Sequence, residues 1–169
     1  PEPRLVDNSP QILDPMTAFQ ITSMLEGVVQ RGTATVVRQV GRPLAGKTGT
    51  TNDFHDAWFV GFSPDLVVGV YLGYDDPRSL GVGNTGGVMA APIFTEFMKV
   101  ALADQPVRAF RVPEGMILRY IDRQSGQPAS GPGAGVILEA YTPAPPPEVR
   151  VATHDVGGNV VLATATAFV

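Results

Sequence analysis

The chain has 169 residues, which is enough for one domain with a hydrophobic core, and its hydrophobic share of 44% excludes wholesale disorder. A net charge of −4 argues against a nucleic-acid partner, because no basic surface is available to neutralise phosphates. Without cysteine the chain can form neither disulfides nor thiolate sites, and a structural zinc site is not expected. No apolar run is long enough to span a bilayer, and the first residues do not resemble a signal peptide. We therefore expect the chain to begin partway through a larger protein.

The first predicted element is a helix over residues 15–30. Asp14 is suited to cap its first turn, and Pro15 favours the first helical position. Gly32 is a plausible end. The apolar residues then recur at helical spacing: Ala18, Ile21, Leu25 and Val28, with Phe19, Met24 and Val29 widening the face.

Three strands are predicted next, over residues 44–51, 57–62 and 66–74. The last two are rich in β-branched and aromatic residues and are separated by Ser63-Pro64-Asp65, which is typical of a hairpin. Short connections between consecutive strands predict an antiparallel meander. After a flexible loop over residues 81–87, a second helix is predicted from residues 90–92, with Ile93, Phe97, Val100 and Ala101 on one face and Pro106 beyond its end. This helix is expected to cover one face of the sheet.

The C-terminal third has weaker patterns. We expect a strand within residues 107–118, turns over residues 120–135 and a proline-rich extended stretch over residues 141–148. The last twenty residues are compatible with a strand, a packed tail or disorder. The expected organisation is a globular part over residues 1–110, an extension of the same domain over residues 111–148, and a tail over residues 149–169. The fold class is α+β.

The tripeptide Lys47-Thr48-Gly49 is the candidate for chemistry. Alone it has low specificity, since for the bare tripeptide a solvated lysine on an ordinary edge strand is the better interpretation. Thr48 and Thr50 are two apart, so their hydroxyls share one face of a strand and together suit a carboxylate. Gly46 and Gly49 leave room for a peptide-like ligand to approach the backbone. Alternation places Lys47 on the opposite face, so its stem has to curl round the strand to reach the same ligand.

The tripeptide belongs to a longer string, Gly46-Lys47-Thr48-Gly49-Thr50-Thr51-Asn52-Asp53, then His55-Asp56-Ala57-Trp58-Phe59-Val60-Gly61-Phe62-Ser63-Pro64. This string resembles the class A penicillin-binding proteins, which are bifunctional peptidoglycan synthases. The likeness continues through residues 70–75, 91–94 and 126–140 and covers roughly residues 10–145. The resemblance implies a serine β-lactamase/D,D-peptidase-like transpeptidase fold, with an antiparallel sheet flanked by helices. Residues beyond about 148 match nothing in the family.

The resemblance also implies functional roles. Lys47 and Thr50 would be catalytic, with Lys47 supplying charge and a proton link and the backbone N–H of Thr50 forming half of an oxyanion hole. Thr48, Gly49, Thr50 and Thr51 would bind substrate. The substrates would be peptidoglycan stem peptides, with β-lactams as inhibitors and no cofactor or metal. The site would lie on the periplasmic side of a bacterial inner membrane, in a parent protein that also has glycosyltransferase activity.

The sequence departs from the family pattern in one large respect. It contains neither a Ser-x-x-Lys nor a Ser-x-Asn motif, and in the family both precede the Lys-Thr-Gly motif. We therefore expect a truncated domain that is inactive alone and requires an N-terminal piece of the same transpeptidase domain carrying the serine nucleophile. Without that piece, the first helix and one face of the sheet are expected to expose apolar surface. A serine β-lactamase and a non-catalytic module that binds peptidoglycan peptides or a partner protein remain the alternatives.

Other polar and aromatic residues have simpler interpretations. His55 is expected to bond locally in a loop, and His154 to be solvated. Asp53 and Asp56 are expected to stabilise the turn between strands instead of forming a carboxylate pair for acid–base chemistry. The aromatic residues of the hairpin (Trp58, Phe59 and Phe62) are expected to pack in the core, with a carbohydrate-binding platform as the alternative.

Overall fold

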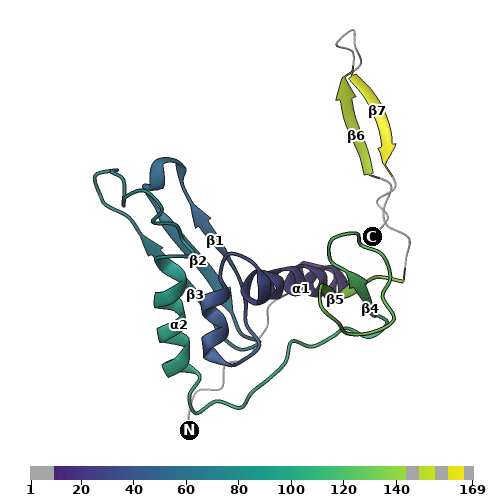
Figure 1. Ribbon diagram of the computed structural model, residues 1–169, viewed down its shortest axis with the longest axis horizontal. Coiled ribbons are helices and arrows are strands. Elements are labelled where there is room, and N and C mark those ends of the chain that lie inside the picture. The colour runs from purple at the N-terminus through teal and green to yellow at the C-terminus, as the bar shows by residue number, and fades with distance from the viewer. Residues whose placement is uncertain (1–9, 144–148, 155–159, 166–169) are drawn as a thin grey trace. The chain divides into compact units, whose positions relative to one another are not determined.

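The computed structural model describes residues 10–143, 149–154 and 160–165, which belong to two compact units, residues 1–112 and 113–169 (Figure 1). The first unit contains the helices α1 (Pro15–Arg31) and α2 (Ala90–Ala101) and the strands β1 (Ala45–Thr50), β2 (Ala57–Phe62) and β3 (Val67–Leu72). Two short 3-10 helices, η1 (Thr35–Val40) and η2 (Asn52–Phe54), flank β1. The fold is α+β, as the sequence predicts.

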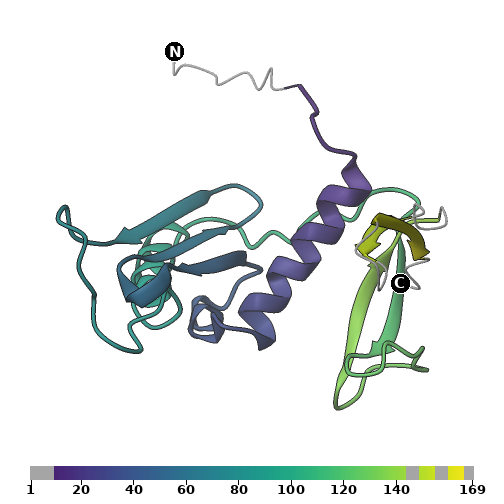
Figure 2. The ribbon, with the colours of Figure 1, turned by 90° about the horizontal axis from the view of Figure 1, so that it is seen from above.

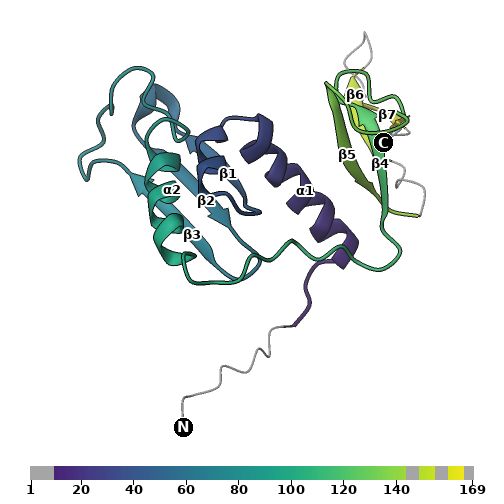
Figure 3. The same ribbon diagram turned by 60° about the horizontal axis from the view of Figure 1, so that its bottom comes forward.

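Helix α1 begins and ends where the sequence predicts. The Asp14 carboxylate accepts a hydrogen bond from the backbone N–H of Thr17 at 2.9 Å, which satisfies one free N–H of the first turn. At the other end the N–H of Gly32 donates to the carbonyl of Val28 at 3.1 Å. The helix runs beside the β1 edge of the sheet, as Figures 2 and 3 both show, and contacts that strand.

The three strands form the predicted antiparallel meander, in the order β1-β2-β3 (Figure 3). The register pairs Thr48 with Phe59 and Lys47 with Val60. Since directly paired residues share a face, Thr48 and Phe59 lie on one face of the sheet and Lys47 and Val60 lie on the other. This division determines which side chains enter the core.

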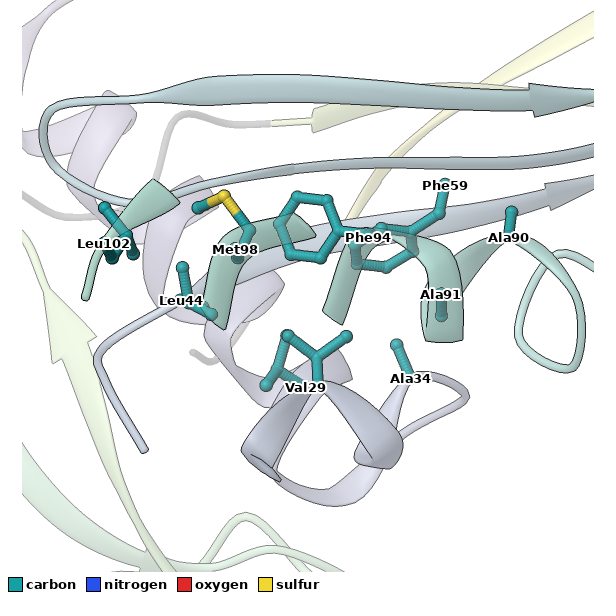
Figure 4. Packing of buried hydrophobic residues seen from close by; sticks show 10 residues of the cluster. Val29, Ala34, Leu44, Phe59, Ala90, Ala91, Phe94, Met98 and Leu102 are labelled. Atoms are coloured by element: carbon teal, nitrogen blue, oxygen red, sulfur yellow. The ribbon is translucent and has the colours of Figure 1, made fainter. Parts of the chain in front are cut away.

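The core lies on the Phe59 face, where α1, η1 and α2 all pack (Figure 4). Phe59 and Phe94 are fully buried and meet edge to face, with ring centroids 4.7 Å apart. The strands beneath these rings carry a glycine pair, Gly46 opposite Gly61. A Cβ on either glycine would come within 2.6 Å of the Phe59 ring, so the ring lies directly on the backbone.

Helix α2 covers one face of the sheet as predicted, but the side of the helix that packs against the sheet is not the predicted one. Its buried residues are Ala90, Ala91, Phe94, Thr95 and Met98. The predicted face is largely exposed, with Ile93 at 48%, Phe97 at 51% and Val100 at 79% of full exposure. The helix is apolar on both sides, so periodicity alone did not distinguish them.

The second face of the sheet is open. Trp58 and Tyr71 lie on it side by side, with ring centroids 4.6 Å apart, and retain 43% and 50% of their full exposure. Val60 and Val67 on the same face are also exposed. The prediction that Trp58 packs in the core is therefore wrong, whereas Phe59 is buried as expected. Among the residues that the structure describes, helices cover only the opposite face. The expected exposure of one sheet face, and of Ile21 and Met24 on α1, is confirmed.

The described part of the second unit contains two antiparallel hairpins, β4 (Ile117–Asp122) with β5 (Val136–Tyr141) and β6 (Val149–His154) with β7 (Val160–Ala165). The strand expected within residues 107–118 begins only at Ile117, and residues 120–122, expected in turns, complete it. Pro113 lacks a backbone N–H, and the Gly115 φ of 82° interrupts an extended chain. The Asp122 carboxylate accepts three hydrogen bonds from the Gln124–Ser125 turn, chiefly from Ser125, and these lower its pKa. Most of the proline-rich stretch and the side chain of His154 lie outside the described residues.

Candidate functional site at the edge strand

The candidate site is built on β1, an edge strand of its sheet. The N–H of Thr51 donates to the carbonyl of Asp56 at 3.1 Å, which makes Thr51 and Asp56 a hydrogen-bonded pair. Because such pairs alternate in an antiparallel ladder, Gly49 bonds to Trp58, and Thr48 and Thr50 direct their N–H and C=O groups away from β2. The edge thus offers the backbone groups that an extended peptide ligand needs.

Lys47 does curl round the strand. Its Nζ donates to the carbonyl oxygen of Thr48 at 2.9 Å and lies 3.4 Å from the Thr48 hydroxyl. The lysine stem starts on the open face of the sheet, yet its ammonium group ends at the strand edge. The Lys47 ammonium and the Thr48 hydroxyl therefore lie together at the strand edge, an arrangement of charge and hydroxyl that suits a carboxylate ligand.

The hydroxyls of Thr48 and Thr50 lie on the same face, as predicted, and each has a partner from a distant part of the chain. The Thr48 Oγ1 is 2.9 Å from the Thr33 Oγ1, in the segment between α1 and η1. The Thr50 Oγ1 accepts a hydrogen bond from the N–H of Gly86 at 3.1 Å, just before α2. Both hydroxyls are thus held in place from below the strand edge.

Thr51 has a different position from the other predicted site residues. Its Oγ1 accepts a hydrogen bond from the N–H of Asp56 at 2.7 Å, which closes the connection between β1 and β2. Asp53 has a φ of 56°, a left-handed conformation that a non-glycine residue adopts at some cost. Its carbonyl accepts a hydrogen bond from the Ser79 hydroxyl at 2.7 Å. The Asp56 carboxylate accepts from the Tyr71 hydroxyl at 2.9 Å, which raises the pKa of Tyr71.

Thr33 and Gly86 were not predicted as part of the site. They lie 15 and 36 residues from their partners in the sequence, and no local pattern links them to β1. The one available signal was the Gly86-Gly87 pair, because adjacent glycines mark a close backbone approach. A Cβ on Gly86 would come 2.5 Å from the carbonyl oxygen of Gly49 and would also clash with that of Trp58.

Within the described part of the chain, no group of three or more histidine, aspartate or glutamate side chains could hold a metal ion. None of the described helices combines the length and apolar content that crossing a membrane requires.

A cavity of about 230 Å³ lies beside Ser63, at the end of the sheet opposite to the Thr50 end of β1. There the Arg42 guanidinium donates to the carbonyls of Gln105 and Ala103, which fixes the chain after α2.

Comparison with known proteins gives a consistent result. The family model "Penicillin binding protein transpeptidase domain" matches residues 6–99. Penicillin-binding protein 1A of Rickettsia bellii is 44% identical over 135 residues, which are 80% of this chain and 17% of that protein. Penicillin-binding protein 1A of Neisseria lactamica is 44% identical over 111 residues, 65% of this chain and 14% of that protein.

A solved structure agrees with these matches. The crystal structure of penicillin-binding protein 1A from Haemophilus influenzae superposes with a TM-score of 0.71 and 32% identity, over 82% of this chain and 22% of that one. The chain thus spans about a sixth of the length of the curated relatives it matches. On the family match over residues 6–99, this chain belongs to the penicillin-binding protein transpeptidase domain family.

Proposed function

We propose that this chain forms the Lys-Thr-Gly wall of a serine-type D,D-transpeptidase site that cross-links peptidoglycan stem peptides. The observation that carries the proposal is the convergence at the edge of β1. There the Lys47 ammonium lies 2.9 Å from the Thr48 carbonyl, and the Thr48 and Thr50 hydroxyls share one face. In this arrangement Lys47, Thr48 and Thr50 bind the C-terminal carboxylate of the donor peptide, or the carboxylate of a β-lactam that resembles it. Gly49 lets the peptide approach the strand.

The proposed reaction proceeds through an acyl-enzyme. A serine Oγ attacks the carbonyl carbon of the penultimate D-alanine, the peptide C–N bond breaks, and the terminal D-alanine leaves with its nitrogen protonated. An amine of a neighbouring stem peptide then attacks the ester, forms the new peptide bond and returns the proton to the serine oxygen. The backbone N–H of Thr50, directed away from β2, donates to the oxyanion in each tetrahedral intermediate. Lys47 relays a proton and stabilises negative charge.

The nucleophile is proposed to come from a segment of the same transpeptidase domain outside these 169 residues, which contain no Ser-x-x-Lys. The open sheet face supports this proposal, because Trp58 and Val60 on β2 and Val67 and Tyr71 on β3 together expose an apolar surface on the face from which the Lys47 side chain starts. Burial of such a surface stabilises association by about 25 cal/mol per Å² of apolar area. A helical segment that covers this face would bring its own side chains to the side from which Lys47 starts.

The proposed setting rests on the resemblance of residues 10–145 to the class A penicillin-binding proteins. We propose that the parent protein is a bifunctional peptidoglycan synthase with a glycosyltransferase domain, and that this site acts on the outer side of the bacterial cytoplasmic membrane. In that setting the 169-residue chain is inactive by itself.

Intact mass spectrometry with benzylpenicillin tests the proposal. The full-length protein should gain the mass of one drug molecule, and the isolated chain should gain none. Lys47→Met in the full-length protein should slow acylation by about 100-fold or more. Lys99→Met is the matched control and should leave acylation unchanged, because Lys99 pairs with Glu96 on the surface of α2. A covalent adduct on the isolated chain would refute the proposed division of the site, and an unmodified full-length protein would refute the function.

A further inference from the structure

The site contains a hydroxyl that no part of the proposed reaction has used, that of Thr33. It lies 2.9 Å from the Thr48 hydroxyl, on the segment between α1 and η1. We propose that Thr33 is a positioning residue, which donates its hydrogen bond to Thr48 and so directs the Thr48 proton toward the ligand carboxylate. This inference rests on the proposed function, because it needs a carboxylate at the β1 edge.

Counting donors and acceptors around Thr48 supports this direction. A hydroxyl has one proton to donate and two lone pairs that accept. The Lys47 ammonium, 3.4 Å away, has only protons to offer, so it approaches a lone pair of the Thr48 oxygen. A carboxylate can only accept. When it takes the Thr48 proton, the Thr33 hydroxyl must be the donor in the pair, and both lone pairs of Thr48 are then used.

Thr33 is held firmly enough for such a role. Its neighbour Ala34 is fully buried in the core, and the N–H of Ala34 donates to the Val28 carbonyl at 3.2 Å at the end of α1. On the other side, Gly87 packs against Thr33 so closely that a Cβ on Gly87 would clash with the Thr33 carbonyl and would lie 3.6 Å from the methyl group of Thr48. The side chain of Thr33 is exposed, but its backbone is fixed from both directions.

Thr50 is oriented by a second contact of the same kind. Its hydroxyl accepts a hydrogen bond from the N–H of Gly86, and a backbone N–H can only donate. The Thr50 proton is therefore free for the same carboxylate. The Thr33 hydroxyl and the Gly86 N–H thus act as donors to Thr48 and Thr50, and this leaves the hydroxyl protons of both threonines available at the strand edge. Organising them before the ligand arrives reduces the cost of ordering them on binding.

The test uses two ligands that differ in one charge, benzylpenicillin and its methyl ester, and measures the second-order acylation rate of the full-length protein. Thr33→Val should lower the rate with benzylpenicillin about fivefold, as expected for one hydrogen bond. The rate with the ester should change less than twofold, because the ester has no charged carboxylate to orient. Thr33→Ser keeps the hydroxyl and should restore the rate with benzylpenicillin.

Thr35→Val is the matched control: it makes the same substitution two residues along, at an exposed position in η1, and should leave both rates unchanged. An equal loss with both ligands would show that Thr33 is merely structural and would overturn the inference, as would an unchanged rate with benzylpenicillin. A wild-type protein that reacts with neither ligand would overturn the proposed function itself, so the two failures are distinguishable.

Discussion

Gly86→Ala is the substitution that most directly tests how the strand edge is supported. The added Cβ would meet the carbonyl oxygens of Gly49 and Trp58, the former at 2.5 Å, and both belong to the backbone of paired strands that cannot move aside separately. The loop has to retreat, and it takes with it the 3.1 Å hydrogen bond from the Gly86 N–H to Thr50. Overpacking of this kind costs about 1–3 kcal/mol, and the lost hydrogen bond adds about 1 kcal/mol.

The expected total is a loss of roughly 2–4 kcal/mol of unfolding free energy, which lowers the melting temperature of a domain of this size by roughly 5–15 °C. Calorimetry of the full-length protein can measure it, with the transition of this domain identified as the one that bound penicillin shifts. Gly131→Ala is the control, because a Cβ there has open space around it, and it should shift the transition by less than about 2 °C. If Gly86→Ala also melts within about 2 °C of wild type, the close approach of this loop to the strands is not what supports Thr50.

Three further outcomes are expected. Phe94→Ala, in the buried edge-to-face pair, should lower the unfolding free energy by about 3–5 kcal/mol in chemical denaturation. Phe97→Ala, on the exposed side of α2, should lower it by less than about 1 kcal/mol. Equal effects would contradict the assignment of the buried and exposed sides of this helix. Asp56→Asn should lower the raised pKa of Tyr71 toward its ordinary value of 10.0 in an ultraviolet titration. Since that pKa is higher in the folded state, the contact stabilises the fold below pH 10 and this stabilisation is lost as the pH rises further, so a flat wild-type stability across alkaline pH would count against it. Trp58 is the single tryptophan, and its fluorescence in the isolated chain should be strongly quenched by acrylamide; a shielded emission would mean that the sheet face is covered.

Local pattern predicted most of the first unit. Asp14 and Pro15 mark the start of α1, and the turn at residues 63–65 gives the hairpin, because capping and turn chemistry depend on neighbouring residues only. The choice of buried face was harder. Trp58 and Phe59 are adjacent aromatics on opposite faces of β2, and nothing in their own strand tells which face the helices cover.

The residues of the candidate site likewise fall into those that local pattern predicted and those that depend on tertiary packing. Alternation along β1 placed Thr48 and Thr50 on one face and required Lys47 to curl round, and the structure has both features. Thr33 and Gly86 could not be found this way, since their contacts with β1 depend on how α1 and α2 pack beneath the sheet. Tertiary packing, and not sequence distance, decides which hydroxyls and amides meet.

The glycine pair under the Phe59 ring constrains how this strand can vary. Gly46 and Gly61 face each other across β1 and β2, and the Phe59 ring lies on both. A Cβ on Gly61 would also meet the Phe94 ring at 2.8 Å, and a Cβ on Gly46 would also meet the backbone of Gly61 and Val60 at 2.8 Å, so a smaller residue at position 59 does not make room by itself. Substitutions of Gly46 and Gly61 should therefore be rare among folded variants selected from a random library, even when position 59 also varies. Selection for altered drug sensitivity would find few single-step solutions in the middle of β1, and would be directed instead to its exposed end and to the loops that meet it.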